Sequence, residues 1–140
     1  PIKGEAPQDW LALPASQFRL LNYRFGESGM GEVWVSLAQG TVLDNLNRWL
    51  NQFGASPVDQ PAMSKMPHVT MAGSEGVFVT AEGDYASGMG APSKPGFALA
   101  GVIASVGGQI LTVKMVGPKA EVEAAKTALE TYAKSLRMAE

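Results

Sequence analysis

The segment "GFALAGVIASVGGQILTVKMVGP", residues 96–118, decides the fold. Two apolar runs flank Gly107-Gly108, and a two-residue glycine turn between such runs is a strong signal for a β-hairpin. Taken literally, this turn opposes three pairs on one face: Val102 with Val113, Ala100 with Met115, and Ala104 with Leu111. That face of the predicted hairpin is entirely apolar.

The other face of the same hairpin is mixed. It carries Leu99, Ile103 and Ile110 beside Ser105, Thr112 and Lys114. A sheet with apolar residues on both faces needs cover on both sides, so we expect helices above and below it.

Two further hairpins are predicted. Residues 18–25 and 32–37 alternate apolar and polar side chains around the turn "GESGMG", 26–31. Residues 68–72 and 76–85 flank "GSEG", 73–76, in the same way. Together with the central hairpin they give a mostly antiparallel sheet of about six strands.

Two helices complete the pattern. Apolar residues recur at helical spacing in 41–54, where Thr41 can cap the start and Gly54 can end the helix. A second helix follows Gly117-Pro118, with Pro118 expected at its first position. The predicted order is ββαββββα: a single α+β domain over residues 10–138, built as an α/β/α sandwich, preceded by a flexible leader, residues 1–9.

Composition excludes several classes of function. Of 140 residues, 46% are hydrophobic and 17% charged, and the formal net charge is −2, so we expect no nucleic acid partner. No apolar run reaches the roughly 18 residues of a transmembrane helix. The chain has no cysteine and one histidine, His68, so we expect no metal site, no cofactor and no catalytic triad.

The glycine-rich stretch "YASGMGAPSKPG", residues 85–96, raises the question of a phosphate site. Pro95 follows Lys94 and has no amide to donate, and a strand rather than a helix is predicted next. We therefore interpret this stretch as a flexible hairpin connection between strands that end near Glu82 and begin near Phe97.

The best candidate for recognition lies on the first helix. Arg48 falls almost opposite the apolar stripe, and Asn45, Asn47 and Asn51 flank it. An arginine framed by amides can bind a carboxylate or phosphate, which makes Asn47, Arg48 and Asn51 the candidate ligand- or partner-binding residues. An ordinary solvated helix face is the alternative.

Four segments carry a resemblance to known families: "W…PASQFRL" (10–20), "VWVSL" (33–37), "NLNRWLNQFG" (45–54) and "VKMVGP" (113–118). They resemble a family of small, uncharacterised bacterial exported proteins, often lipoproteins, with an Asn-x-Asn-Arg-Trp motif. Leu50 stands where that family has a second arginine.

The order of strands and helices also resembles the sandwich of the photosystem II protein PsbP and the Ran-binding protein Mog1. The first resemblance implies export to the periplasm or the membrane surface, through an N-terminal segment or lipid anchor upstream of Pro1.

Two functions follow as hypotheses. The first is a non-catalytic binding or interaction module of the bacterial cell envelope, whose partner is an unknown protein or small ligand. The alternative is a small hydrolase-type enzyme that assembles carboxylates such as Glu32, Glu82 or Asp84 in a cleft. A pocket that holds two of these carboxylates would favour the enzyme.

Overall fold

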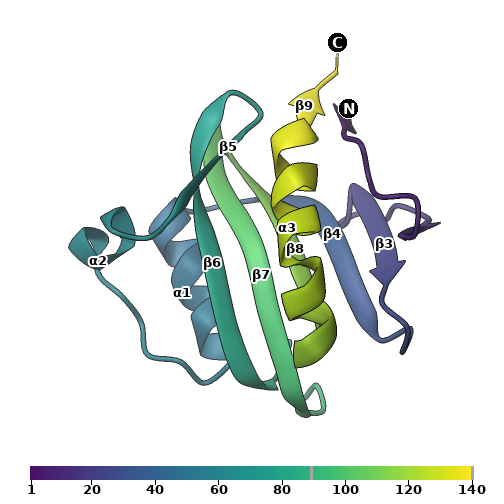
Figure 1. Cartoon of the computed structure of the whole chain (residues 1–140). Coiled ribbons are helices and arrows are strands. Elements are labelled where there is room, and N and C mark those ends of the chain that lie inside the picture. The colour runs from purple at the N-terminus through teal and green to yellow at the C-terminus, as the bar shows by residue number, and fades with distance from the viewer. Residues whose placement is uncertain (89, 140) are drawn as a thin grey trace.

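A seven-stranded antiparallel sheet forms the centre of the molecule (Figure 1). The computed structural model describes residues 1–88 and 90–139. The strand order is β2-β3-β4-β8-β7-β6-β5. The strands are β2 (Leu11–Leu13), β3 (Leu21–Phe25), β4 (Gly31–Ala38), β5 (His68–Met71), β6 (Ser74–Tyr85), β7 (Lys94–Val106) and β8 (Gln109–Pro118).

The central hairpin has the register that its glycine turn predicts. Val102 pairs with Val113, and the flanking pairs are Ala100 with Met115 and Ala104 with Leu111. Gly107 and Gly108 both have positive φ, at 56° and 80°, as a tight turn of this type requires. The β7–β8 hairpin therefore confirms the pairing on which the fold prediction rests.

Helices cover both faces of the sheet, as the mixed hairpin predicts. α1 (Val42–Gln52) packs on β6 and β7 from one side, and α3 (Lys119–Ser135) packs on β7, β8 and β5 from the other (Figure 1). Thr41 caps α1 together with Asp44 in a reciprocal capping box, and Gly54 follows the helix with a φ of 68°. The predicted α+β sandwich is confirmed.

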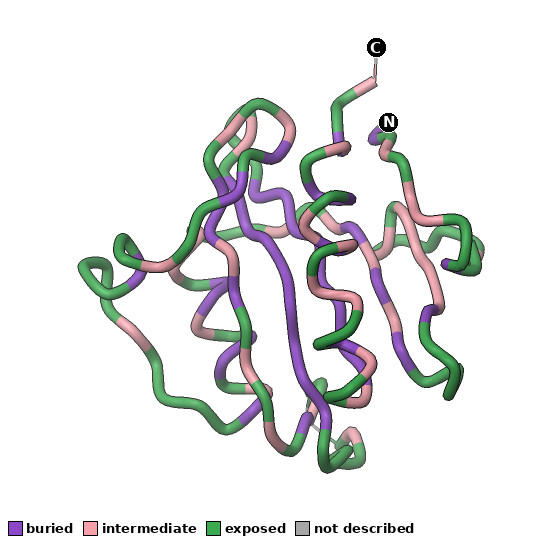
Figure 2. The backbone as a smooth tube through the Cα atoms, viewed as in Figure 1, coloured by how far each residue is buried: buried purple, intermediate pink, exposed green. Residues whose placement is uncertain are grey.

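The sheet separates two apolar cores. Figure 2 shows the central strands buried along most of their length, whereas helices and loops alternate between buried and exposed. The core on the α3 side includes Val33, Val35, Val113, Leu129 and Tyr132. The core on the α1 side includes Leu46, Trp49, Phe53, Leu99 and Ile103.

Several elements differ from the prediction. Residues 1–9 are held to the body, because β1 (Ile2–Lys3) pairs with β9 (Arg137–Met138) and Ile2 is buried. A short helix, α2 (Gln60–Ser64), lies between α1 and β5, where the predicted order has no helix. Pro118 is the N-cap of α3 and not its first helical residue. β2 adds a seventh strand to the sheet.

The glycine-rich connection is shorter than predicted. β6 continues to Tyr85, which is buried, and β7 begins at Lys94, so only residues 86–93 connect them. The amide of Ala86 donates to the carbonyl of Gln52, and Gln52 Nε2 donates to the carbonyl of Ser87. The start of the connection is therefore docked on α1. Met89, within the same stretch, lies outside the described residues.

Candidate ligand-binding site

A cavity of about 550 Å³ lies beside α1 on one face of the sheet. α1 packs mainly on β6 and β7, and the cavity lies beside it, over part of β4 and β8. Trp34, Ser36, Thr112 and Lys114 line it from those two strands. The other lining residues belong to α1, to the loop before β3, to the segment 37–39, and to Tyr85 and Ser87.

Buried polar side chains gather at this cavity. Among the described residues only Asn45, Thr112 and Lys114 are polar and buried, and all three line it. A buried polar group destabilises a fold unless it is hydrogen-bonded, so three of them in one place indicate a specific arrangement and not chance.

Asn45 orients Arg48. The amide nitrogen of Asn45 donates to the carbonyls of Gln39 and Thr41, at 2.9 and 2.8 Å. Its oxygen Oδ1 therefore points away from these carbonyls and accepts from Arg48 Nη2 at 2.9 Å. This bond holds the exposed Arg48 side chain at the cavity, where the remaining N–H groups of its guanidinium are available to a ligand.

Lys114 projects into the cavity from β8 and is only 4% exposed. Its Nζ lies 5.1 to 5.5 Å from the ring centroids of Trp34, Trp49 and Tyr85 and donates to Gln52 Oε1. Burial, followed by the positive charges of Arg48 and Arg19, lowers the pKa of Lys114 to about 7, although Glu32 opposes this effect.

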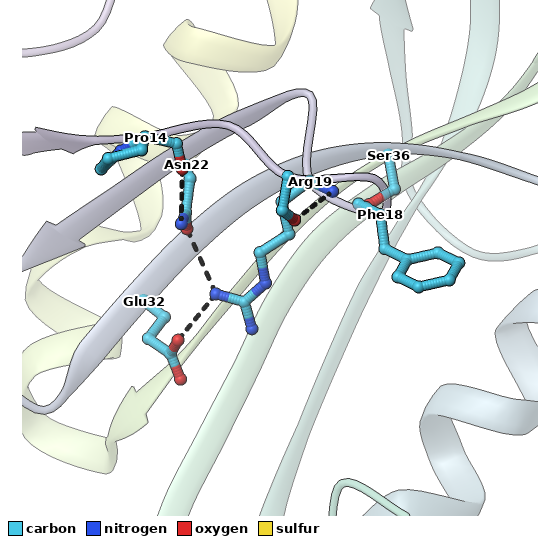
Figure 3. Close-up of polar contacts among 7 residues, drawn as sticks. Pro14, Phe18, Arg19, Asn22, Glu32 and Ser36 are labelled. Atoms are coloured by element: carbon cyan, nitrogen blue, oxygen red, sulfur yellow. Dashed lines mark hydrogen bonds and ion pairs between the residues drawn. The ribbon is translucent and has the colours of Figure 1, made fainter.

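Arg19 closes the cavity on the side of the loop before β3. Its Nη1 lies 2.8 Å from Glu32 Oε1 and 3.2 Å from Asn22 Oδ1, and its guanidinium stacks 4.0 Å from the ring centroid of Trp34. Figure 3 shows the Arg19 side chain directed toward Glu32 and Asn22, with the Phe18 ring pointing away from them. Phe18 is 75% exposed and forms an apolar lip on the cavity.

The charges in and around the cavity favour an anion. Arg19, Arg48 and Lys114 bring three basic groups to it. Of these three, only Arg19 forms an ion pair within the described part of the chain, with Glu32. Basic side chains with free donors, in a partly desolvated place, bind carboxylates and phosphates.

Of the three predicted site residues, the structure places only one at the cavity. Arg48 lines the cavity, whereas Asn47 and Asn51 are not among its lining residues. Asn47 holds the connection after α1, since its side chain both donates to and accepts from the backbone of Val58, at 3.0 and 2.8 Å. Asn51 lies exposed on the outer side of α1. A role for Asn47 and Asn51 in ligand binding stays a prediction.

Arg19, Lys114 and Tyr85 line the cavity but are not among the residues that the sequence predicts for the site. Lys114 carried a usable signal, because it is the one charged residue within the apolar strand "ILTVKMV", 110–116. A lysine on the mixed face of a covered strand indicates either a ligand or a buried partner. The sequence around Arg19 gives no sign that this residue lies near Lys114.

The carboxylates of the alternative hypothesis do not meet. Glu32 pairs with Arg19 on the α1 side of the sheet, and Glu82 pairs with Lys119, the first residue of α3, at 2.8 Å. Asp84 is exposed, and neither it nor Glu32 lines the pocket that contains Glu82. His68 is exposed on the edge strand β5, 3.9 Å from Glu75.

Two properties of the described residues bear on the site classes considered. Within residues 1–88 and 90–139, no group of three or more His, Asp or Glu side chains is placed to hold a metal ion. Over the same ranges, no helix combines the length and the apolar character needed to cross a membrane.

The sequence matches no family model and no curated protein. The solved structures that are similar to this chain include three that match over 99% of its length. A protein from Bacteroides thetaiotaomicron has a TM-score of 0.57 at 12% identity, with 45% of its own length covered. This chain thus corresponds to less than half of that protein.

The other two neighbours match over most of their own length. LpqN of Mycobacterium tuberculosis, described as involved in cell envelope biogenesis, has a TM-score of 0.54 at 13% identity, with 83% of its chain covered. The cyanobacterial PsbP (CyanoP) of Synechocystis has a TM-score of 0.52 at 12% identity, with 92% covered. These likenesses establish a PsbP-like fold. The Asn-x-Asn-Arg-Trp family and the likeness to Mog1 stay predictions.

Proposed function

We propose that this protein is a non-catalytic binding module that takes a small anionic ligand, a carboxylate or phosphate, in the cavity beside α1. One observation carries the proposal: Arg19, Arg48 and Lys114 line one cavity, and only one of them has an acidic partner among the described residues. A protein with a formal net charge of −2 has no general excess of positive charge, so this concentration is local.

The positions of the carboxylates support binding over hydrolysis. General acid–base chemistry by paired carboxyl groups needs both within reach of one substrate. Glu32 and Glu82 belong to opposite faces of the sheet, and Glu32 is occupied by Arg19. The cavity instead offers hydrogen-bond donors and aromatic rings, which suit ligand binding.

We place this module in the bacterial cell envelope as part of the proposal. The support is indirect: the resemblance of four segments to exported proteins, and a fold shared with LpqN, whose description names envelope biogenesis. Fold alone does not determine function. Fractionation of cells that express the full-length gene, followed by detection of the protein, tests the location, and recovery in the cytoplasm alone would contradict it.

Thermal melts at constant ionic strength test the anion site. Phosphate or acetate, exchanged for chloride, is expected to raise the melting temperature with a saturable dependence, because a ligand bound only to the native state stabilises it. Arg48→Gln should weaken binding by about tenfold, the effect of losing one charge-assisted hydrogen bond. Arg137→Gln, at an exposed arginine in β9, is the matched control. Equal melting temperatures in all anions would contradict the proposal.

A further inference from the structure

We infer that Lys114 is the nucleophile of a reversible covalent site, which captures a small oxo acid by forming an imine with its carbonyl group. The inference rests on the proposed function, because the same cavity must first bind the carboxylate of that acid. It adds a defined class of ligand: a molecule that carries both a carbonyl and a carboxylate group.

The surroundings of the Lys114 amine suit a nucleophile. The Nζ atom donates to one side-chain acceptor, Gln52 Oε1, and the rings of Trp34, Trp49 and Tyr85 surround it at 5.1 to 5.5 Å. These rings exclude water from the amine without forming an ion pair with it. Among the described residues, no carboxylate forms a salt bridge with Lys114.

The protonation state supports the same role. Only a neutral amine attacks a carbonyl, and an ordinary lysine is almost fully protonated at neutral pH. With its pKa lowered to about 7 by burial and by Arg48 and Arg19, Lys114 is neutral in a large fraction of molecules at that pH. Lys119 shows the opposite effect, since its hydrogen bond with Glu82, followed by the charges of Glu82 and Glu123, raises its pKa.

The two arginines define the rest of the ligand. Arg48 and Arg19 line the cavity that Lys114 lines, and a guanidinium binds a carboxylate with fixed geometry. A carboxylate held there brings an adjacent carbonyl group toward the amine. A simple ketone or aldehyde lacks this anchor, so an oxo acid should react in preference to it.

The step balances without a redox partner. The amine of Lys114 adds to the carbonyl carbon and gives a carbinolamine, which loses the oxygen as water when the C=N bond forms. The proton that leaves nitrogen departs with that water. Burial, followed by Glu32, raises the pKa of Tyr85, so its phenol stays protonated at neutral pH. A proton that the phenol gives to the leaving oxygen is replaced by the one that nitrogen releases, so Tyr85 contributes no net proton.

Reductive trapping with pyruvate as the probe tests the inference. The protein is incubated at neutral pH with pyruvate and borohydride, and intact mass and peptide mapping locate the product. We expect one adduct, with the mass of pyruvate less one water plus two hydrogens, at Lys114. Acetone at equal concentration should label Lys114 far less, and Arg48→Gln should reduce labelling by about tenfold at low pyruvate.

Two variants, and lactate as an anion that cannot form an imine, distinguish a covalent site from a site that only binds anions. Lys114→Met should lose the adduct while its melting curve shows a folded protein, and Lys65→Met, at an exposed lysine, should keep it. Adducts spread over several amines, or acetone labelling equal to that of pyruvate, would overturn the inference. A saturable melting shift with pyruvate and with lactate, but no reducible adduct, would overturn it and leave the anion site intact. No shift with any anion would overturn both.

Discussion

The two faces of the sheet have opposite characters. The face under α3 is apolar along the central strands β4, β7 and β8, and α3 packs Val122, Leu129 and Tyr132 on it. The face under α1 is apolar where the helix packs on β6 and β7, but on β8 it carries the buried polar residues Thr112 and Lys114, which line the cavity. The same strands therefore build a packed core on one side and a polar cavity on the other.

We link the α3 face to the stability of the fold and the polar part of the α1 face to the proposed recognition of a ligand. Tyr132 illustrates the first, since its hydroxyl is paired with that of Tyr23 and its ring packs edge-on against Trp10, 5.1 Å between centroids. Lys114 has the second role in the function that we propose, because a buried amine opposes folding and strongly perturbed groups in a cavity are typical of functional sites. The comparison predicts that substitutions on the two faces change different properties.

The largest expected effect is on Trp49, which connects the two functions of the α1 face. Trp49 is 2% exposed in the core and also lines the cavity beside Lys114. Trp49→Ala should lower the free energy of unfolding by about 3–5 kcal/mol, as the loss of a large buried aromatic side chain does. Leu129→Ala on the other face should lower it by about 2–5 kcal/mol. Denaturant melts measure both, and only Trp49→Ala should also abolish anion binding.

Lys114→Met should stabilise the protein at pH 6, by about 1–4 kcal/mol, because a flexible apolar side chain replaces a buried charge. The direction in which stability changes with pH follows from the lowered pKa of Lys114. Unfolded lysine keeps its proton up to about pH 10.5, whereas folded Lys114 releases it near pH 7. Between these values the unfolded state binds more protons, so the stability of the wild type rises with pH and the full penalty applies below pH 7.

Melts from pH 6 to 10 measure this effect. The wild type should gain stability over that range relative to Lys114→Met, and the difference between them should shrink as pH rises. Lys65→Met should stay within about 0.5 kcal/mol of the wild type at each pH, as substitutions on the surface do. A Lys114→Met variant that is destabilised at pH 6 would show that the amine is held by favourable contacts.

Gly101→Ala tests how closely α1 approaches the sheet. A Cβ on Gly101 would lie 2.6 Å from the carbonyl oxygen of Val113 and 2.7 Å from Trp49 Cζ3. Overpacking of this kind destabilises by about 1–3 kcal/mol. Gly88→Ala is the control, since a Cβ there meets nothing within 4 Å. If both variants melted alike, the fit of Trp49 against the β7 backbone would not limit the position of α1.

The parts of the fold predicted from the sequence depend on local signals. The β7–β8 register follows from Gly107-Gly108, and the bounds of α1 follow from Thr41, Asp44 and Gly54. α2 was not predicted, because a segment of five residues is too short to show helical spacing of apolar side chains, although Asp59 caps the helix. The β1–β9 pair joins the two ends of the chain, and no local pattern indicates such a contact.

The candidate site was predicted only in part, because only one of its basic residues lies in a segment with a clear local pattern. Arg48 was found because its helix is strongly amphipathic, which shows the polar side in the sequence alone. Its neighbours Arg19 and Lys114 come from a loop and from β8, and they meet Arg48 because α1 packs mainly on β6 and β7, beside β8. That offset between helix and sheet is a property of tertiary packing.

The smallest expected effect on stability is at Arg48, and it separates recognition from folding most sharply. Arg48 is exposed, and its hydrogen bond goes to Asn45, which keeps its two backbone acceptors without it. Arg48→Ala should therefore change the free energy of unfolding by no more than about 0.5 kcal/mol. Removal of its positive charge should also raise the pKa of Lys114, since Arg48 is one of the groups that lower it. Titration of the Lys114 amine, followed by NMR in both proteins, measures that change, while a large loss of stability would make Arg48 part of the framework and not of the binding surface.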